Sequence, residues 1–228
     1  MKVAVVIPVF NERDSLPLVV GGIPRDVVGE IVVVDNGSTD DTRLVASGLP
    51  VRLVREARRG YGSACLAGIA ALEASPPEVV VFLDGDFSDH PEELPRLTGA
   101  IAAGADLALG SRVLGSREPG ALLPQARFGN ALACLLILLL FRHRYTDLGP
   151  FRAIRWEALR SLGMEDRDFG WTVEMQLKAL RRGLTVVEVP VSYRRRVGVS
   201  KITGTLSGTL AAGWKILWTI ARYGLRRS

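Results

Sequence analysis

Two aspartates, Asp84 and Asp86, are the residues best suited to chemistry, in the stretch VFLDGDFSDHPEEL that covers residues 81–94. Their carboxylates stand one residue apart directly after an apolar run, and like charges so close repel each other. Such a pair needs a cation beside it. Hard oxygen ligands suit Mg²⁺ or Mn²⁺, ions that commonly share their coordination with substrate phosphates. A D-x-D pattern also arises by chance, so its meaning depends on the elements that position it.

The first half of the chain alternates between apolar runs and helical segments. Continuous apolar runs rich in β-branched residues are typical of buried parallel strands, and they cover residues 3–9, 30–35, 51–56, 79–84 and 106–111. Helices are expected over residues 11–20, 40–47 and 60–74, with another that opens at Pro91. This order predicts an α/β fold in which helices cover both faces of a parallel sheet.

The second half is less regular. A Gly- and Pro-rich loop is expected over 112–126, a helix over 127–141, an irregular strand in LGPFRAIRW, a helix over 171–183 and a strand over 185–195. The apolar stretch ALACLLILLLF, residues 131–141, is shorter than the roughly 20 residues that a bilayer span needs. We therefore expect a buried or interfacial helix there and no transmembrane segment. No linker separates the two halves, which predicts a single domain.

Composition restricts the class of protein. The 228 residues are 48% hydrophobic and 23% charged, as in ordinary globular proteins, and the net charge of +5 favours anionic partners. The two cysteines, Cys65 and Cys134, lie in apolar or small-residue surroundings, which indicates a reducing compartment. The N-terminal MKVAVVIPVF is too short for a signal peptide. A cytoplasmic protein is the expectation.

Polar residues gather where four of the predicted strands end. In open α/β sheets, ligands bind beyond the carboxyl ends of the strands. The residues at these ends are Pro8, Asn11 and Glu12, then Asp35, then Asp84 and Asp86, and finally Ser111 and Arg112. Asp and Asn are also common turn formers, but their concentration at one edge favours a ligand site. The chain has no G-x-x-x-x-G-K-[ST] motif, and RRGYGSACLAG lacks the G-x-G-x-x-G spacing of dinucleotide folds.

Several of these segments together resemble a known family. The series VVIPVFNE, VVDNGSTDDT, RRGYGSACLAGI, FLDGDFSDHPEEL and GSR resembles family 2 glycosyltransferases of the GT-A fold. TDLGPFRAI, GWTVEMQLKA and GVSK resemble the dolichol-phosphate mannose synthase and polyprenyl-phosphate glucosyltransferase branch. The resemblance covers about residues 2–203. It implies a Rossmann-like, mostly parallel sheet in one domain over 1–204, with a nucleotide-sugar half (1–112), an acceptor half (113–204) and a basic amphipathic helix over 205–228.

The resemblance also implies a role for each matching position. The donor would bind at Pro8, Asn11, Glu12, Asp35, Gly60 and Asp84. Asp84 and Asp86 would hold Mg²⁺ or Mn²⁺ against the donor diphosphate, with Ser88 as a further ligand, directly or through water. Arg112 and Arg127 would clamp the acceptor phosphate. Arg195 or Arg196, with Lys201, would neutralise phosphate charge from a closing loop.

The implied reaction is an inverting, metal-dependent transfer of a hexose from UDP-glucose or GDP-mannose to a polyprenyl phosphate. The alternative keeps the donor and uses a hydroxyl of a soluble small molecule or glycan. A phosphate acceptor is already anionic, whereas a hydroxyl needs a base, for which Asp147 and Glu174 are candidates beside the catalytic Asp86 and Arg112. Structural roles remain open for both: a turn aspartate, and a helix carboxylate paired with Lys178 at i+4.

The C-terminal tail is strongly basic. After Glu188 the chain has no acidic residue and eight Lys or Arg. In a helix over 205–223, one face would hold Leu206, Leu210, Trp214, Leu217 and Ala221, with Trp218 at its margin and Lys215, Arg222 and Arg226 opposite. Such a helix either packs on the core with a solvated basic flank, or lies in the membrane interface with its cations on acidic lipid. The second interpretation predicts a peripheral protein on the cytoplasmic membrane face.

Two other classes compete with this interpretation. A nucleotidyltransferase also uses a Rossmann-like sheet and a carboxylate-held metal, but it would release pyrophosphate. A basic nucleic-acid-binding protein is compatible with the charge. Aromatic residues are only 7%, however, and the basic residues concentrate in one tail beside an apolar face, so no nucleic-acid partner is expected. The oligomeric state is left open.

Overall fold

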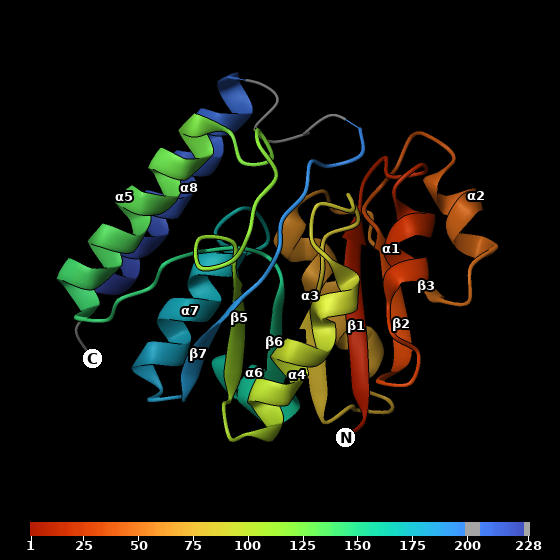
Figure 1. The fold of residues 1–228 in the computed structure, drawn as a ribbon, viewed down its shortest axis with the longest axis horizontal. Coiled ribbons are helices and arrows are strands. Elements are labelled where there is room, and N and C mark those ends of the chain that lie inside the picture. The colour runs from red at the N-terminus through yellow and green to blue at the C-terminus, as the bar shows by residue number, and fades with distance from the viewer. Residues whose placement is uncertain (199–205, 226–228) are drawn as a thin grey trace.

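A seven-stranded mixed sheet forms the centre of the protein, in the strand order β3-β2-β1-β4-β6-β5-β7 (Figure 1). The computed structural model describes residues 1–198 and 206–225. The strands are β1 (Val3–Val9), β2 (Val28–Asp35), β3 (Arg52–Arg55), β4 (Val79–Phe82), β5 (Leu107–Ser111), β6 (Arg152–Arg155) and β7 (Val186–Pro190). The predicted strands are confirmed within a few residues, except that the last ends at Pro190 rather than 195.

One strand runs against the others. β1 pairs in parallel with β2 and β4, and β5 pairs in parallel with β7. β6 lies between β4 and β5 and is antiparallel to both. The predicted parallel sheet is therefore mixed. Because β6 runs back from the ligand edge, the loop before it, 146–151, lies at the same edge as the ends of β4 and β5.

Helices cover both faces of the sheet. They are α1 (Leu16–Gly22), α2 (Thr42–Ser47), α3 (Tyr61–Leu72), α4 (Leu94–Ala102), α5 (Pro124–Phe141), α6 (Trp156–Leu162), α7 (Trp171–Arg181) and α8 (Leu206–Leu225), with a 3₁₀ turn over Pro91–Glu93. One buried cluster joins the sheet to α1, α2 and α4, and the other joins it to α3 and α5–α8. α6 was not predicted, and α5 begins three residues before the expected position 127.

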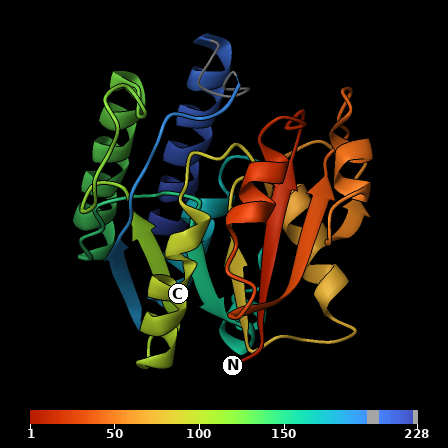
Figure 2. The ribbon, with the colours of Figure 1, turned by 45° about the vertical axis from the view of Figure 1, so that its right-hand side comes forward.

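α5 and α8 lie side by side at one end of the molecule (Figures 1 and 2). α5 has 18 residues and, among the described residues, is the one helix whose length and composition would allow it to cross a membrane. Only 17% of its residues are buried, so of the two alternatives expected for residues 131–141, a buried or an interfacial helix, the buried one does not hold. Its exposed apolar side chains are Phe128, Leu135, Leu138, Leu139 and Leu140.

α8 packs on the domain with one side, as the first interpretation of the tail predicts. Thr219 and Ile220 are buried, so this side of the helix packs on the domain, whereas Trp214 and Trp218 are exposed on the other side. Lys215, whose side chain is 37% exposed, pairs its ammonium with Asp166 at 3.0 Å. The side chains of Leu206, Leu210 and Arg226, like all of Lys201, lie outside the described part of the chain.

Gly68 allows α3 to approach the sheet closely. A Cβ atom at this position would lie 2.4 Å from Val6 Cγ1, in the fully buried centre of β1. Gly68→Ala is therefore expected to lower the free energy of unfolding by about 1–3 kcal/mol, as overpacked cores do.

The matched control is Gly99→Ala in α4, where a Cβ atom would meet nothing within 4 Å. This exposed helical position should gain about 1 kcal/mol from the higher helix propensity of alanine. Urea unfolding measures both variants, and equal effects on stability would contradict the proposed packing of α3.

Candidate active site

A cavity of about 310 Å³ opens at the carboxyl ends of the parallel strands. Six residues predicted from the sequence line it: Pro8, Glu12, Gly60, Asp84, Asp86 and Arg196. The other nine that line it were not predicted: Val9, Phe10, Asn36, Arg59, Tyr61, Ala64, Gly85, Asp168 and Phe169. We call this space the donor cavity. The strands bring its walls together because β1, β2 and β4 are adjacent and end at the same edge.

Asn11 and Asp35 shape the donor cavity without being among its lining residues. Asn11 takes the left-handed conformation (φ +55°), which asparagine tolerates, and its Oδ1 accepts the Thr39 N–H at 2.8 Å. Asp35 is buried and accepts the Ser38 N–H at 3.0 Å. The loops after β1 and β2 therefore form one wall. In the structure the two predicted donor-binding residues act on loop conformation.

Asn36 extends this wall to the loop after β3. Its side-chain amide donates to the carbonyls of Glu56 (3.2 Å) and Arg58 (2.7 Å), and its Oδ1 accepts the Gly60 N–H at 2.9 Å. Asparagine is so common in turns that its position in VVDNGSTDD did not distinguish it.

Asp86 has partners for both oxygens. Its Oδ1 accepts hydrogen bonds from the Ser88 N–H (2.9 Å) and hydroxyl, and its Oδ2 pairs with Arg196 Nη1 at 2.9 Å. Ser88 is buried, is not among the residues lining the donor cavity and directs its hydroxyl at Asp86. Its contact with a cation would therefore run through Asp86.

Asp84 has no such partners. Its Oδ1 is buried without a hydrogen bond, and none of the ion pairs in the described part of the chain includes it. Burial, and then the neighbouring Asp86, raise the pKa of Asp84 to about 7. Asp84 lines the donor cavity, and its buried Oδ1 lacks a hydrogen-bond partner there, as a ligand of a cation would in the absence of the ion.

The donor set fits a hard divalent ion only together with a substrate. Within residues 1–198 and 206–225, no group of three His, Cys, Asp or Glu side chains could hold an ion. Mg²⁺ and Mn²⁺ in phosphate-transfer sites take one or two carboxylates and complete their coordination with phosphate oxygens and water. Asp84 and Asp86 match that arrangement.

The segment 191–197 crosses this edge and delivers Arg196. Its backbone donates from Arg194 N–H to Ser88 O (2.9 Å) and from Val197 N–H to Asp86 O (3.0 Å). Arg195 is directed elsewhere, because its Nε donates to Pro119 O at 2.7 Å. Of the two arginines that the sequence left open, the structure brings Arg196 to the donor cavity.

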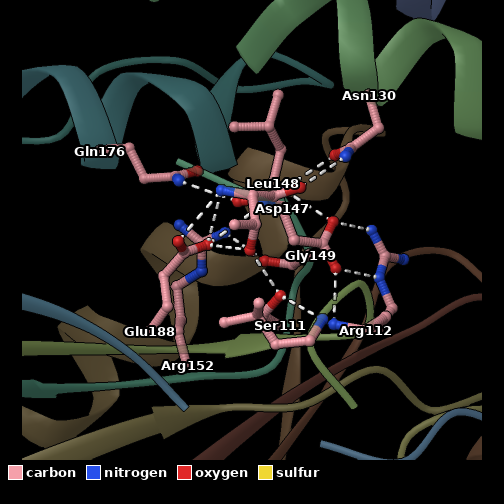
Figure 3. A network of polar contacts seen from close by, with 11 residues as sticks. Ser111, Arg112, Asn130, Asp147, Leu148, Gly149, Arg152, Gln176 and Glu188 are labelled. Carbon is pink, nitrogen blue, oxygen red and sulfur yellow. Dashed lines mark hydrogen bonds and ion pairs between the residues drawn. The ribbon is translucent and has the colours of Figure 1, made fainter. Parts of the chain in front are cut away.

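Arg112 and Asp147 form a bidentate, buried ion pair (Figure 3). Arg112 Nε donates to Asp147 Oδ2 at 2.8 Å and Nη2 donates to Oδ1 at 2.7 Å; the side chains are 12% and 1% exposed. Burial opposes ionisation, yet the Arg112 guanidinium and further hydrogen bonds hold the pKa of Asp147 below its usual value. The Asp147 carboxylate is fully used in structural bonds.

The loop that carries Asp147 receives side chains from several elements (Figure 3). Asn130 of α5 donates to Thr146 O at 2.9 Å and accepts the Leu148 N–H at 3.0 Å. Glu188 of β7 accepts the Thr146 N–H at 2.9 Å, and Gln176 of α7 donates to Asp147 O at 3.1 Å. These polar residues were not singled out from the sequence, because their partners are distant in the chain.

Glu174 is likewise engaged. The predicted i+4 pair with Lys178 is confirmed at 2.8 Å, and the carboxylate also accepts the Asp166 N–H (2.7 Å) and the Tyr223 hydroxyl (3.0 Å). Glu174 thus joins α7 and α8 to the loop 163–170, whose residues Asp168 and Phe169 line the donor cavity.

A second basic cavity lies at the start of α5. Arg127, an exposed residue, lines this space of about 470 Å³ together with Arg117, Asn130 and Thr146. We call it the acceptor cavity. Arg112 lines neither the donor cavity nor the acceptor cavity. It can affect them only indirectly, through the loops that its ion pair with Asp147 holds in place. Arg117 was not predicted from the sequence.

Asp147→Asn is expected to lower the free energy of unfolding by about 3–5 kcal/mol at pH 7, because it leaves the buried Arg112 without its partner. The folded-state pKa of Asp147 is lowered, so its contribution is present above the unfolded pKa of about 3.9 and is lost as the pH falls through the folded pKa. The difference between wild type and variant should therefore vanish in acid.

Urea unfolding between pH 3 and pH 7 measures this difference. The control is Asp14→Asn, whose side chain is 75% exposed and should change stability by less than about 0.5 kcal/mol. A variant at Asp147 as stable as the control would contradict a stabilising ion pair.

Comparison with known proteins agrees with this geometry. Residues 4–163 match the family model "Glycosyl transferase family 2". The chain is 35% identical to undecaprenyl-phosphate mannosyltransferase of Micrococcus luteus over 251 residues, covering 99% of this chain and 100% of that protein. It is 33% identical to polyprenol monophosphomannose synthase of Mycolicibacterium smegmatis over 220 residues, covering 90% and 82%.

A solved structure shares the fold. Glucosyl-3-phosphoglycerate synthase from Mycobacterium tuberculosis, in complex with Mn²⁺, UDP and glucosyl-3-phosphoglycerate, superposes with a TM-score of 0.79 at 24% identity, over 100% of this chain and 81% of that one. At this identity the likeness shows the fold alone, and it confirms the predicted GT-A architecture. With the family model covering most of the chain and both relatives aligned over most of their lengths, this protein belongs to glycosyltransferase family 2.

Proposed function

We propose that the protein transfers a hexose, with inversion, from a nucleotide sugar to a polyprenyl phosphate, using Mg²⁺ or Mn²⁺. The observation that carries the proposal is the placement of two cavities on either side of Tyr193. Its backbone pairs with Asp89 beside the acidic loop and with Arg117 of the acceptor cavity. An acidic, cation-requiring cavity thus adjoins a basic cavity at the foot of an exposed apolar helix.

The donor cavity suits a nucleotide diphosphate. Asp84 and Asp86 would hold the divalent ion, which neutralises charge that develops on the leaving diphosphate. Arg196 is already held at the cavity by its ion pair with Asp86, so its guanidinium needs little movement to pair with a phosphate. The loops joined by Asn36 and Asn11 leave space for the nucleoside.

The acceptor cavity suits an anionic acceptor. Arg117 and Arg127 supply cations, and the N-terminus of the 18-residue α5 supplies unpaired N–H groups with a favourable dipole. Asp147 and Glu174 are both engaged in structural bonds, so neither is available as a base without breaking them. A phosphate oxygen needs no deprotonation, and its attack opposite the leaving group inverts the anomeric carbon.

The outer surface of α5 and α8 suits a membrane. We define the α5–α8 face by the exposed apolar residues Phe128, Leu135, Leu138, Leu139, Leu140, Trp214 and Trp218. Exposed patches of this kind mark interaction sites. Placed on the cytoplasmic leaflet, the face would bring the acceptor cavity at the start of α5 to the headgroup region, where a lipid-linked phosphate lies. The two relatives named above carry polyprenyl acceptors in their names.

A soluble acceptor is the alternative, favoured by one observation. The structural neighbour with the same fold was solved with a glucosyl-3-phosphoglycerate, a water-soluble product. That acceptor presents a hydroxyl, so this alternative requires a base in the present protein, such as Asp147 after release from Arg112.

The assay offers UDP-glucose and GDP-mannose, each labelled in the sugar, with Mn²⁺ and polyprenyl phosphate in anionic vesicles. We expect one donor to give label that partitions into organic solvent, and Asp86→Asn to abolish it. Label that stays in the aqueous phase, with soluble phosphorylated acceptors added, would favour the alternative. Release of pyrophosphate from a nucleoside triphosphate would indicate a nucleotidyltransferase.

Leu139→Gln tests the membrane contact. The side chain is 68% exposed on α5 and belongs to the α5–α8 face, and burying a leucine in lipid contributes about 1.5–3 kcal/mol. The variant should bind anionic vesicles about tenfold more weakly in co-sedimentation. Leu44→Gln is the matched control, because Leu44 is 72% exposed on α2, which does not belong to this face. Equal losses in the two variants would contradict the assignment of the face.

A further inference from the structure

A further cavity, of about 340 Å³, lies between α8 and the loops 56–60 and 163–170. Of the residues that line it, only Arg59 and Asp168 also line the donor cavity, and none lines the acceptor cavity. We call it the α8 cavity. The proposed reaction gives it no role. Charged residues of both signs line it: Arg58, Arg59, Glu165, Asp166, Arg167, Asp168, Glu174, Lys215 and Arg222.

Positive charge is in excess in the α8 cavity. Two of its four carboxylates are already paired, Asp166 with Lys215 at 3.0 Å and Glu174 with Lys178 at 2.8 Å. The other two carboxylates and all four arginines take part in no ion pair within residues 1–198 and 206–225: Glu165, Asp168, Arg58, Arg59, Arg167 and Arg222. Four guanidinium groups against two carboxylates leave two positive charges in excess.

The arginines without an acidic partner converge from distant parts of the chain. Arg58 follows β3, Arg167 precedes α7, and Arg222 lies in the last turn of α8. Like charges gathered around one space repel each other, and a bound anion would relieve that repulsion. Guanidinium groups present a planar fork of N–H donors that matches the oxygens of a phosphate. The cavity therefore suits a ligand that carries a phosphate group.

Trp218 connects the α8 cavity to the proposed membrane surface. It lines the cavity and also belongs to the α5–α8 face, where it is 45% exposed. Arg222 Cζ lies 5.2 Å and Lys215 Nζ lies 5.9 Å from the centroid of its ring, so two cations flank it. Tryptophan side chains of membrane proteins concentrate at the level of the lipid headgroups. A lipid phosphate beside Trp218 would thus lie next to these arginines.

We propose that the α8 cavity binds the phosphodiester headgroup of an anionic membrane lipid through Arg58, Arg167 and Arg222. The inference rests on the membrane contact of the proposed function. It adds a second lipid site, which is distinct from the acceptor cavity and takes no part in the chemistry. Because Arg59 and Asp168 line both the α8 cavity and the donor cavity, the bound headgroup would lie next to the donor cavity.

The probe is dihexanoyl phosphatidylglycerol, kept below its micelle concentration so that it acts as a soluble headgroup. The protein is labelled with 5-fluorotryptophan, and its four tryptophans are followed by ¹⁹F nuclear magnetic resonance. We expect the Trp218 signal, assigned through Trp218→Phe, to shift saturably. Dihexanoyl phosphatidylcholine, which has no net charge, should not shift it. Inorganic phosphate that shifts the signal as strongly at the same concentration would contradict a lipid ligand and indicate a site for soluble phosphates.

Arg222→Gln and Arg167→Gln each remove one cation of the α8 cavity and leave the lining of the donor cavity unchanged. Each should weaken the binding of phosphatidylglycerol about tenfold, as the loss of a hydrogen bond to a charged group does. Neither removes an ion pair of the described part of the chain, so both variants should melt at the wild-type temperature.

Arg142→Gln is the matched control. Arg142 is an exposed arginine at the C-terminal end of α5 and lines none of the three cavities named above. The variant removes the same charge as the two others, and its affinity for phosphatidylglycerol should equal that of the wild type.

Binding to anionic vesicles separates this site from the proposed function. Suppose that Leu139→Gln weakens vesicle binding, but phosphatidylglycerol leaves Trp218 unshifted or binds Arg222→Gln and Arg167→Gln as well as Arg142→Gln. The headgroup site is then overturned and the membrane contact stands. If the wild-type protein does not bind anionic vesicles at all, the membrane contact fails and the lipid ligand with it.

Discussion

The buried ion pair between Arg112 and Asp147 is the interaction on which the rest of the site depends. It joins the end of β5 to the loop before the antiparallel β6, and that loop also receives Asn130 from α5, Gln176 from α7 and Glu188 from β7. A buried pair stabilises only when its geometry is good and its remaining polar atoms are satisfied. Here the bidentate contact and the backbone N–H groups of Arg112 and Leu148 meet that condition. The loop thereby ties Thr146, which lines the acceptor cavity, to the end of β5.

The acidic loop after β4 differs from the Arg112–Asp147 pair, because it contains buried carboxyl oxygens that have no hydrogen-bond partner. Asp84 Oδ1 and both carboxyl oxygens of Asp89 are buried there without a hydrogen-bond partner, and the fold must offset the cost of burying them. A site in which every negative charge is already paired with a positive charge would not favour the binding of a cation. The stabilising pair at Asp147 thus positions the loops, whereas the acidic loop would, in the proposed function, hold the divalent ion. Arg196 takes part in the latter, since its present partner Asp86 is also a proposed ligand.

The strands could be predicted because buried parallel strands are continuous apolar runs, and VAVVIPV and EIVVVD have no other interpretation. The direction of β6 could not, since RAIR carries no signal for strand order. α6 was missed because Trp156 follows directly on that strand, with no side-chain cap to mark the start. Asp84, Asp86 and Arg196 were found through their motifs. Asn36 and Arg117 were not, because their significance lies in contacts with segments that are distant in the chain.

Polar contacts join the exposed helices α5 and α8 to the loops of the site. On a membrane, these contacts would limit which acceptor phosphates the site can reach. Asn130 binds α5 to the loop 146–149, and Lys215 and Tyr223 bind α8 to the loop 163–170 and to Glu174. With the α5–α8 face resting on a bilayer, these bonds would hold the site at a constant height above the lipid. A phosphate attached directly to its lipid tail would lie within that height, whereas one carried on a long polar spacer would pass beyond it. Acceptor choice would then be a matter of distance from the membrane as much as of chemical recognition.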